Sequence, residues 1–169
     1  MLNIQKWIDN SILRKKSVNI PSKEITNGKY KELISLMKRE IDNPEEWKIT
    51  LGISAPQIWE NIRIIVIREV ISTTRKWEII EDKVYEMINP EILEKSSWTN
   101  LDYEGCLSVP WIEDRVLRSN TIKVKYTSED WVENIREYVG LNARVIQHEI
   151  DHLDWVLFTD YLKNRNYYF

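Results

Sequence analysis

The spacing of apolar residues along the chain predicts helices and strands in turn. Residues 62–67 are β-branched apolar residues interrupted by one arginine, a composition typical of a buried strand, and residues 84–88 form a second candidate. Residues 29–41 instead carry apolar side chains at the spacing of one face of an amphipathic helix. These side chains are Leu33, Ile34, Met37 and Ile41.

The second half of the chain changes from strand periodicity to helix periodicity. Apolar and polar residues alternate over residues 121–126, which predicts a half-buried strand, and residues 132–139 fit the returning strand. Residues 141–153 follow a helical pattern with apolar positions around much of the circumference, so this helix should be buried. We therefore expect an α+β fold: antiparallel strands packed around a central buried helix, plus an N-terminal helix.

Composition adds limits to this picture. A chain of 169 residues without repeats or linkers fits a single domain, residues 1–169, and a net charge of −3 argues weakly against broad nucleic-acid binding. The longest apolar run is far too short to span a membrane, and the N-terminus lacks the pattern of a signal peptide. We expect a cytoplasmic monomer without membrane association. A single cysteine agrees with a reducing compartment.

Residues 147–155, QHEIDHLDW, carry the strongest chemical signal. His148 and His152 are four residues apart, so on a helix both imidazoles project from one face and can bind one metal ion. Glu149 follows the first histidine and is suited to act as a general base towards water. The alternative is a pair of ordinary histidines, which the added glutamate makes much less attractive.

A metal bound by two histidines needs a further protein ligand, and the chain has no third histidine. The candidates are a carboxylate or the lone Cys106, which lies in the segment EGCLSVP directly after Gly105. As a thiolate, Cys106 would complete a Cys–His–His site with a fourth position open, the arrangement of catalytic sites. Taken alone, a single cysteine is more often a small buried apolar residue.

Three segments together resemble the signature motifs of the peptide deformylase family: GISAPQ at 52–57, EGCLS at 104–108 and QHEIDHL at 147–153. Their order and spacing suit that family, and the similarity extends over essentially the whole chain. Three positions depart from the family pattern. Ser54 stands where alanine is usual, while Thr50 and Trp155 stand where glycine is usual.

The resemblance implies a metal-dependent hydrolase that removes the N-formyl group from the N-terminal methionine of nascent proteins, releasing formate. It implies Fe²⁺ as the native ion, with Zn²⁺, Ni²⁺ or Co²⁺ able to occupy the site. N-formylmethionyl peptides would be the substrates, and the ribosome near the nascent-chain exit a partner. The implied metal ligands are Cys106, His148 and His152, with Glu149 as the proton-transfer residue and with the Gln57 side chain and the Leu107 N–H as oxyanion donors.

Other charged residues near these motifs have weaker interpretations. Glu104 has an implied structural role in holding the loop before Cys106. Asp151 could orient one of the metal ligands by a contact from outside the metal site, although a solvated helix face is the favoured interpretation. Arg118 either anchors the substrate or supports the fold.

Two other functions stay open. A zincin-like metallopeptidase shares the two-histidine helix, but such enzymes usually take a further His or Glu ligand downstream. The 17 residues after His152 contain neither. A catalytically impaired, deformylase-like binding protein is the second alternative, although every proposed catalytic residue is present.

The chain has eight tryptophans and only four glycines, an unusual balance. Tryptophan stands where turn geometry or the family pattern favours glycine, at Trp59, Trp111, Trp131 and Trp155, with Trp77 and Trp98 as weaker cases. One hypothesis is that the source reads UGA as glycine and that these residues are UGA codons written as tryptophan. The alternative is a divergent enzyme with an unusually aromatic surface.

Overall fold

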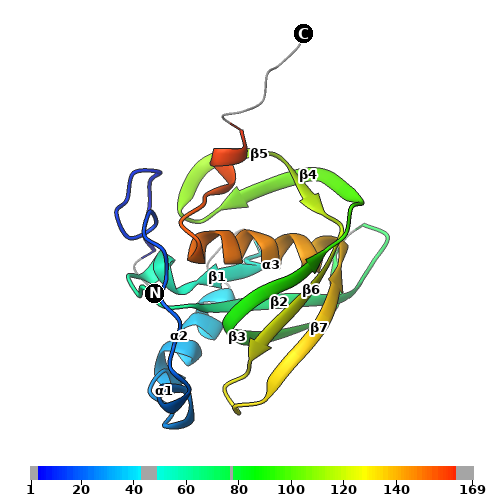
Figure 1. The fold of residues 1–169 in the computed structure, drawn as a ribbon. Coiled ribbons are helices and arrows are strands. Elements are labelled where there is room, and N and C mark those ends of the chain that lie inside the picture. The colour runs from blue at the N-terminus through cyan, green and yellow to red at the C-terminus, as the bar shows by residue number, and fades with distance from the viewer. Residues whose placement is uncertain (1–3, 43–48, 77, 163–169) are drawn as a thin grey trace.

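The computed structural model describes residues 4–42, 49–76 and 78–162, which form two antiparallel sheets with helix α3 between them (Figure 1). The larger sheet has the strand order β1 (Gly52–Ser54), β2 (Ile64–Thr73), β3 (Ile79–Lys95), β6 (Thr121–Thr127) and β7 (Glu133–Val139). The smaller sheet is the hairpin of β4 (Thr99–Cys106) and β5 (Val109–Ser119). The helices are α1 (Ser22–Thr26), α2 (Lys31–Ile41) and α3 (Gly140–Leu153), with 3₁₀ turns η1 (Ala55–Ile58) and η2 (Phe158–Tyr161). The predicted class, antiparallel strands with few helices, is confirmed.

The larger sheet is covered on both faces, which explains the continuous apolar run in β2. Alternate side chains of a strand point to opposite faces. Ile65 and Ile67 pack in the core beneath α3, whereas Ile64 and Val66 pack in a second core with α2. A strand buried on both faces reads as uninterrupted hydrophobic sequence because neither face meets water.

Helix α3 has an apolar side and a polar side. Its apolar side chains join tyrosines and β-branched residues of the larger sheet in one core. Its polar side chains hydrogen-bond to the β4–β5 hairpin, as Arg144 does to Glu104 and Gln147 to Ser119. The helix is therefore buried by two different kinds of contact. Its apolar members are Ala143, Val145, Ile146, Ile150 and Leu153.

Most predicted elements match the structure. The helix expected over 29–41 is α2, and the strands expected at 62–67, 84–88, 121–126 and 132–139 fall within or overlap β2, β3, β6 and β7. The β4–β5 hairpin was not predicted, because most of its residues are exposed and it carries no apolar period. Within the described part of the chain, no helix is long and apolar enough to cross a membrane.

Several positions, in turns and at irregular points of strands, have a left-handed backbone, with φ between 51° and 83°. Among the described residues these are Gly28, Gly140, Asn89 and five tryptophans, Trp7, Trp59, Trp111, Trp131 and Trp155. The four tryptophans singled out as strong glycine-like positions are thus confirmed in that backbone conformation, and Trp7 is an addition. Trp98 does not share it, and Trp77 lies outside the described residues.

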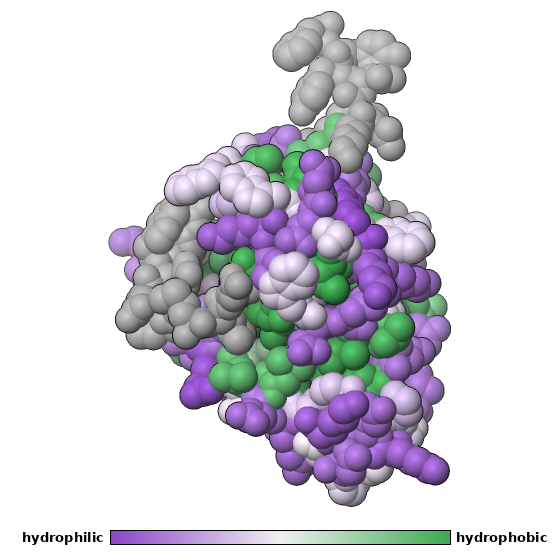
Figure 2. Space-filling model, turned by 90° about the vertical axis from the view of Figure 1, so that its left-hand side faces the viewer, coloured by the Kyte–Doolittle hydropathy of each residue, from purple (hydrophilic) through white to green (hydrophobic). Residues whose placement is uncertain are grey.

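The surface retains apolar area as well as charge. Figure 2 shows one face on which hydrophobic side chains form an uncovered area between hydrophilic ones. The described tryptophans also lie at the surface, and each is at least 50% exposed. The two cores are therefore built without any of these indoles.

Candidate metal centre

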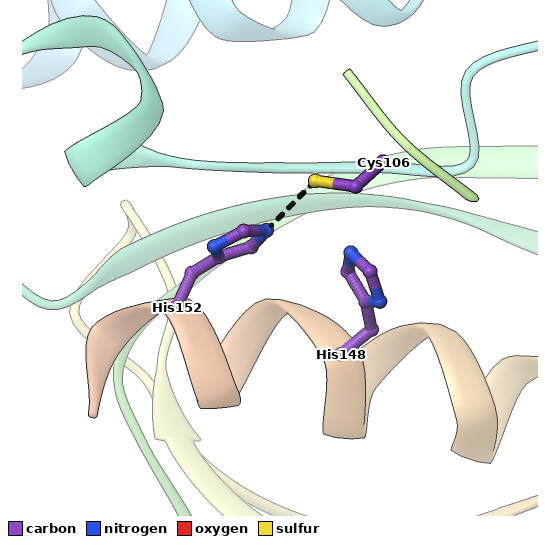
Figure 3. A group of neighbouring side chains, drawn as sticks. All are labelled: Cys106, His148 and His152. Atoms are coloured by element: carbon purple, nitrogen blue, oxygen red, sulfur yellow. Dashed lines mark hydrogen bonds between the residues drawn. The ribbon is translucent and has the colours of Figure 1, made fainter. Parts of the chain in front are cut away.

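The two histidines of α3 and the cysteine at the end of β4 converge on one point (Figure 3). Because His148 and His152 are one helical turn apart, their rings project from the same side of α3. The Cys106 Sγ atom lies 3.2 Å from His152 Nε2, and the three candidate ligand atoms lie within 4.8 Å of one another. The spacing expected from the sequence is thus realised, and the cluster could hold a metal ion.

Glu104 determines which nitrogen of His148 faces this cluster. Its carboxylate lies 2.9 Å from His148 Nδ1. Burial alone would raise the pKa of Glu104, but hydrogen bonds from Arg118 and His148 hold it far below its ordinary value. An ionised carboxylate can only accept, so His148 Nδ1 donates and Nε2 is left free for a cation.

Glu104 is itself held by two buried arginines. Arg118 donates to both carboxylate oxygens, at 2.8 and 2.9 Å, and Arg144 donates to one of them at 2.7 Å. Arg144 also donates to the backbone carbonyls of Val116 and Asn100, so it joins α3 to both strands of the hairpin. The position of His148 therefore depends on a fixed set of charges in β4, β5 and α3.

Asp151 lies on the far side of Arg118. It pairs with the second end of that guanidinium and accepts a hydrogen bond from Tyr161 at 3.0 Å. The favoured interpretation of a solvated helix face is therefore wrong, because the side chain is ion-paired and only 18% exposed. Arg118 supports the fold and faces Glu104 and Asp151.

The environment of Cys106 favours its thiolate form. Burial alone would raise the pKa of the thiol, but the charge of His152 and hydrogen bonds to both histidines lower it well below its usual value. A thiolate is the form in which cysteine binds metals. One sulfur and two imidazole nitrogens supply three protein ligands, which suits a tetrahedral ion that keeps its fourth position open. The donor set thus fits a catalytic cation.

Glu149 lies beside this cluster in a buried position. It is 4% exposed, and its Oε2 atom is buried without a hydrogen-bond partner among the described residues. Burial raises the pKa of Glu149, although the neighbouring histidines oppose the shift. A carboxyl group with a raised pKa is better matched to proton transfer near neutral pH than an exposed one.

Gly52 makes room for this carboxylate. A Cβ atom at position 52 would lie 2.6 Å from Glu149 Oε1, a distance that no side chain tolerates without displacement. Strand β1 can therefore approach α3 closely only because residue 52 is glycine.

Gln57 presents its amide nitrogen to the same site. Its side-chain oxygen accepts hydrogen bonds from the Ser54 N–H and hydroxyl, at 2.8 and 2.9 Å, which fixes the orientation of the amide. Its Nε2 then points to Ser108 Oγ at 3.1 Å and towards Cys106 Sγ at 3.7 Å. Leu107, the residue directly after Cys106, is half-buried in the turn that follows β4.

Sequence reasoning did not identify two residues that shape the site, Arg144 and Ser108. Arg144 sits in a helix with mixed character, and nothing in its local pattern indicates that it reaches Glu104. Ser108 is fully buried and lies between the Gln57 amide and the Cys106 sulfur, to which its N–H donates at 3.4 Å. Only the fold reveals these contacts.

Two histidines of a buried helix, a cysteine at the end of a strand and a buried glutamate beside them form the kind of site that metal-dependent hydrolases use. The polypeptide deformylase family model matches residues 1–167. The peptide deformylase of Chlorobium phaeobacteroides (strain BS1) is 38% identical over 166 residues, covering 98% of this chain and 83% of the relative.

Solved structures agree with the sequence relatives. The class I type b peptide deformylase of Acinetobacter baumannii with Met-Ala-Ser bound has a TM-score of 0.84 and 30% identity, covering 95% of this chain and 98% of that one. The peptide deformylase of Thermotoga maritima has a TM-score of 0.79 and 32% identity, covering 95% and 97% of the two chains. This chain belongs to the peptide deformylase family.

Proposed function

We propose that this chain hydrolyses the formyl amide of N-formylmethionyl peptides, giving formate and a free amino terminus. The observation that carries the proposal is the convergence of Cys106, His148 and His152 beside the buried Glu149 in a chain of this family. Binding of Met-Ala-Ser by the Acinetobacter baumannii relative supports a peptide that begins with methionine. The single catalytic domain would be residues 1–169.

In this proposal Cys106, His148 and His152 hold one divalent ion. That ion would supply Lewis acidity and would lower the pKa of water. We propose Fe²⁺ as the native ion, because a soft thiolate with two imidazoles suits iron, with Zn²⁺, Ni²⁺ or Co²⁺ as possible substitutes. Glu104 keeps His148 in the tautomer that can bind.

The protein groups then divide the chemistry. Glu149 accepts the proton of the attacking water and passes a proton to the departing amine. The Gln57 amide N–H and the Leu107 backbone N–H donate to the formyl oxygen, where negative charge develops in the transition state. The fixed orientation of the Gln57 amide by Ser54 supports this role, because a preorganised donor does not have to reorient during the reaction.

The substrate determines the cellular setting that we infer. Formylated amino termini arise on nascent chains, so the enzyme, which we propose is a monomer, would act in the cytoplasm near the ribosomal exit. This part of the proposal follows from the substrate and not from a surface of the molecule.

The test is formate release from a formyl-Met-Ala-Ser peptide by anaerobically purified protein, with metal analysis of the same sample. Glu149→Gln should keep the metal and lose roughly 10²–10⁴-fold in turnover, because it removes proton transfer alone. Cys106→Ala should lose both metal and turnover.

Other outcomes identify the competing functions. Full metal content in Cys106→Ala, together with cleavage of internal peptide bonds, would favour the zincin-like metallopeptidase. Metal-loaded protein that binds the peptide but releases no formate would favour a catalytically impaired binding protein.

A further inference from the structure

The positions with a left-handed backbone carry a residue type that rarely adopts this conformation. Of eight described residues with positive φ, two are glycine, one is asparagine and five are tryptophan. Glycine adopts this region freely and asparagine does so often, whereas a bulky residue there is a genuine outlier. No other type of bulky residue joins the set within the described part of the chain, so the anomaly is specific to tryptophan.

Four of the five tryptophans donate backbone hydrogen bonds that help to define their local geometry. Trp59 ends η1, with its N–H donating to the carbonyls of Ala55 and Pro56. The Trp131 N–H donates to Ser128 O at 2.9 Å in the β6–β7 turn, and the Trp155 N–H donates to His152 O after α3. The Trp7 N–H donates to Ser108 O at 2.8 Å. At these four positions, a change of the backbone to negative φ would disturb these hydrogen bonds.

The indoles of these residues also have no pocket. Their exposed fractions run from 50% at Trp131 to 92% at Trp111. Tryptophan is usually among the most buried residues on average, and its large apolar surface is its main contribution to stability. A position that combines a left-handed backbone with no pocket to bury its side chain has the properties of a glycine site.

We propose that the natural protein carries glycine at positions 7, 59, 111, 131 and 155, encoded by UGA codons that its source reads as glycine. A single reassigned codon explains why one residue type occupies all five sites. The alternative is that five glycines with left-handed backbone were each replaced independently by tryptophan. This would need five separate mutations that destabilise the fold. Trp98 does not have the left-handed backbone, so it provides an internal control for the effect of that backbone conformation.

The direct test uses the gene and the protein from the source cells. UGA codons at the five positions, with glycine in the corresponding peptides by mass spectrometry, are the expected result. UGG codons, or peptides that contain tryptophan at these positions, would overturn the proposal.

The stability test uses purified variants and separates the backbone from the ring. At each of the five sites, Trp→Gly should melt roughly 2–4 °C above Trp→Ala, because both remove the indole and only glycine relieves the left-handed strain. At Trp98 the order should reverse or vanish, because glycine there only adds freedom to the unfolded chain. Equal melting temperatures for the glycine and alanine variants at the five sites would contradict the proposal.

Discussion

The two sides of helix α3 are held in place by different forces. Towards the larger sheet, Ile146, Ile150 and Leu153 pack in an apolar core. Towards the β4–β5 hairpin, Arg144 and His148 meet the buried carboxylate of Glu104. Apolar burial is strong but non-directional, whereas charge-assisted hydrogen bonds fix angles as well as distances. The candidate metal ligands lie on the side where direction matters.

The polar side is also the more vulnerable one. A buried ion pair contributes little net stability once desolvation is counted, but the loss of one partner leaves the other charge buried and unpaired. The Glu104 carboxylate pairs at the same time with Arg118, Arg144 and His148. The comparison therefore predicts that one neutralised carboxylate lowers both stability and metal affinity, whereas one truncated core residue lowers stability alone.

The largest effect is expected for Glu104→Gln. The variant should lose about 3–5 kcal/mol of unfolding free energy, because two guanidinium groups keep a neutral partner only. Its metal affinity should fall by roughly 10–100-fold, because His148 loses the carboxylate that orients it. Urea unfolding followed by circular dichroism and metal titration measure the two quantities.

Glu94→Gln is the matched control for that change. Glu94 also pairs with a cation, Lys123, but this pair is open to water, with side chains 70% and 43% exposed. Its loss should cost at most about 1 kcal/mol. Equal losses of unfolding free energy in Glu104→Gln and Glu94→Gln would show that the buried network contributes no more to stability than an exposed ion pair.

Ile146→Ala tests the opposite side of α3. Ile146 is fully buried in the core with the larger sheet, so the cavity should cost about 2–5 kcal/mol. The metal affinity of the folded fraction should be unchanged, because no polar contact of the hairpin is touched. A fall in affinity as large as that of Glu104→Gln would show that the two sides are not separable.

Among the changes to buried residues, the smallest effect is expected for Ile150→Val, which removes one methylene group from the same core. The cost should be about 0.5–1.5 kcal/mol, with formate release per folded molecule at the wild-type level. A larger loss of activity than of stability would place Ile150 in the site instead of the core.

The same division explains what the sequence could predict. Apolar periodicity revealed α2, α3 and the strands of the larger sheet, because burial leaves a local pattern. The His148–His152 spacing likewise is local, and it predicted two of the three candidate ligands directly. The resemblance to a known family was needed to choose Cys106 over a carboxylate.

The polar side left no such trace. The β4–β5 hairpin has few buried side chains, so its strands do not alternate visibly. Arg144 and Glu104 are 40 positions apart, and their contact exists only because the hairpin folds over α3. Asp151 looked like a solvated residue for the same reason. Long-range ion pairs cannot be inferred from periodicity, since neither partner differs locally from a surface charge.

The placement of the indoles has a practical consequence for spectroscopy. Each tryptophan in the described part of the chain lies at least half in water. In a chain that carries these tryptophans, their fluorescence should therefore peak at wavelengths close to those of the unfolded chain. Tyr85, Tyr126 and Tyr138 are buried in the core with α3, so tyrosine absorbance in the near ultraviolet should be the better optical signal of that core.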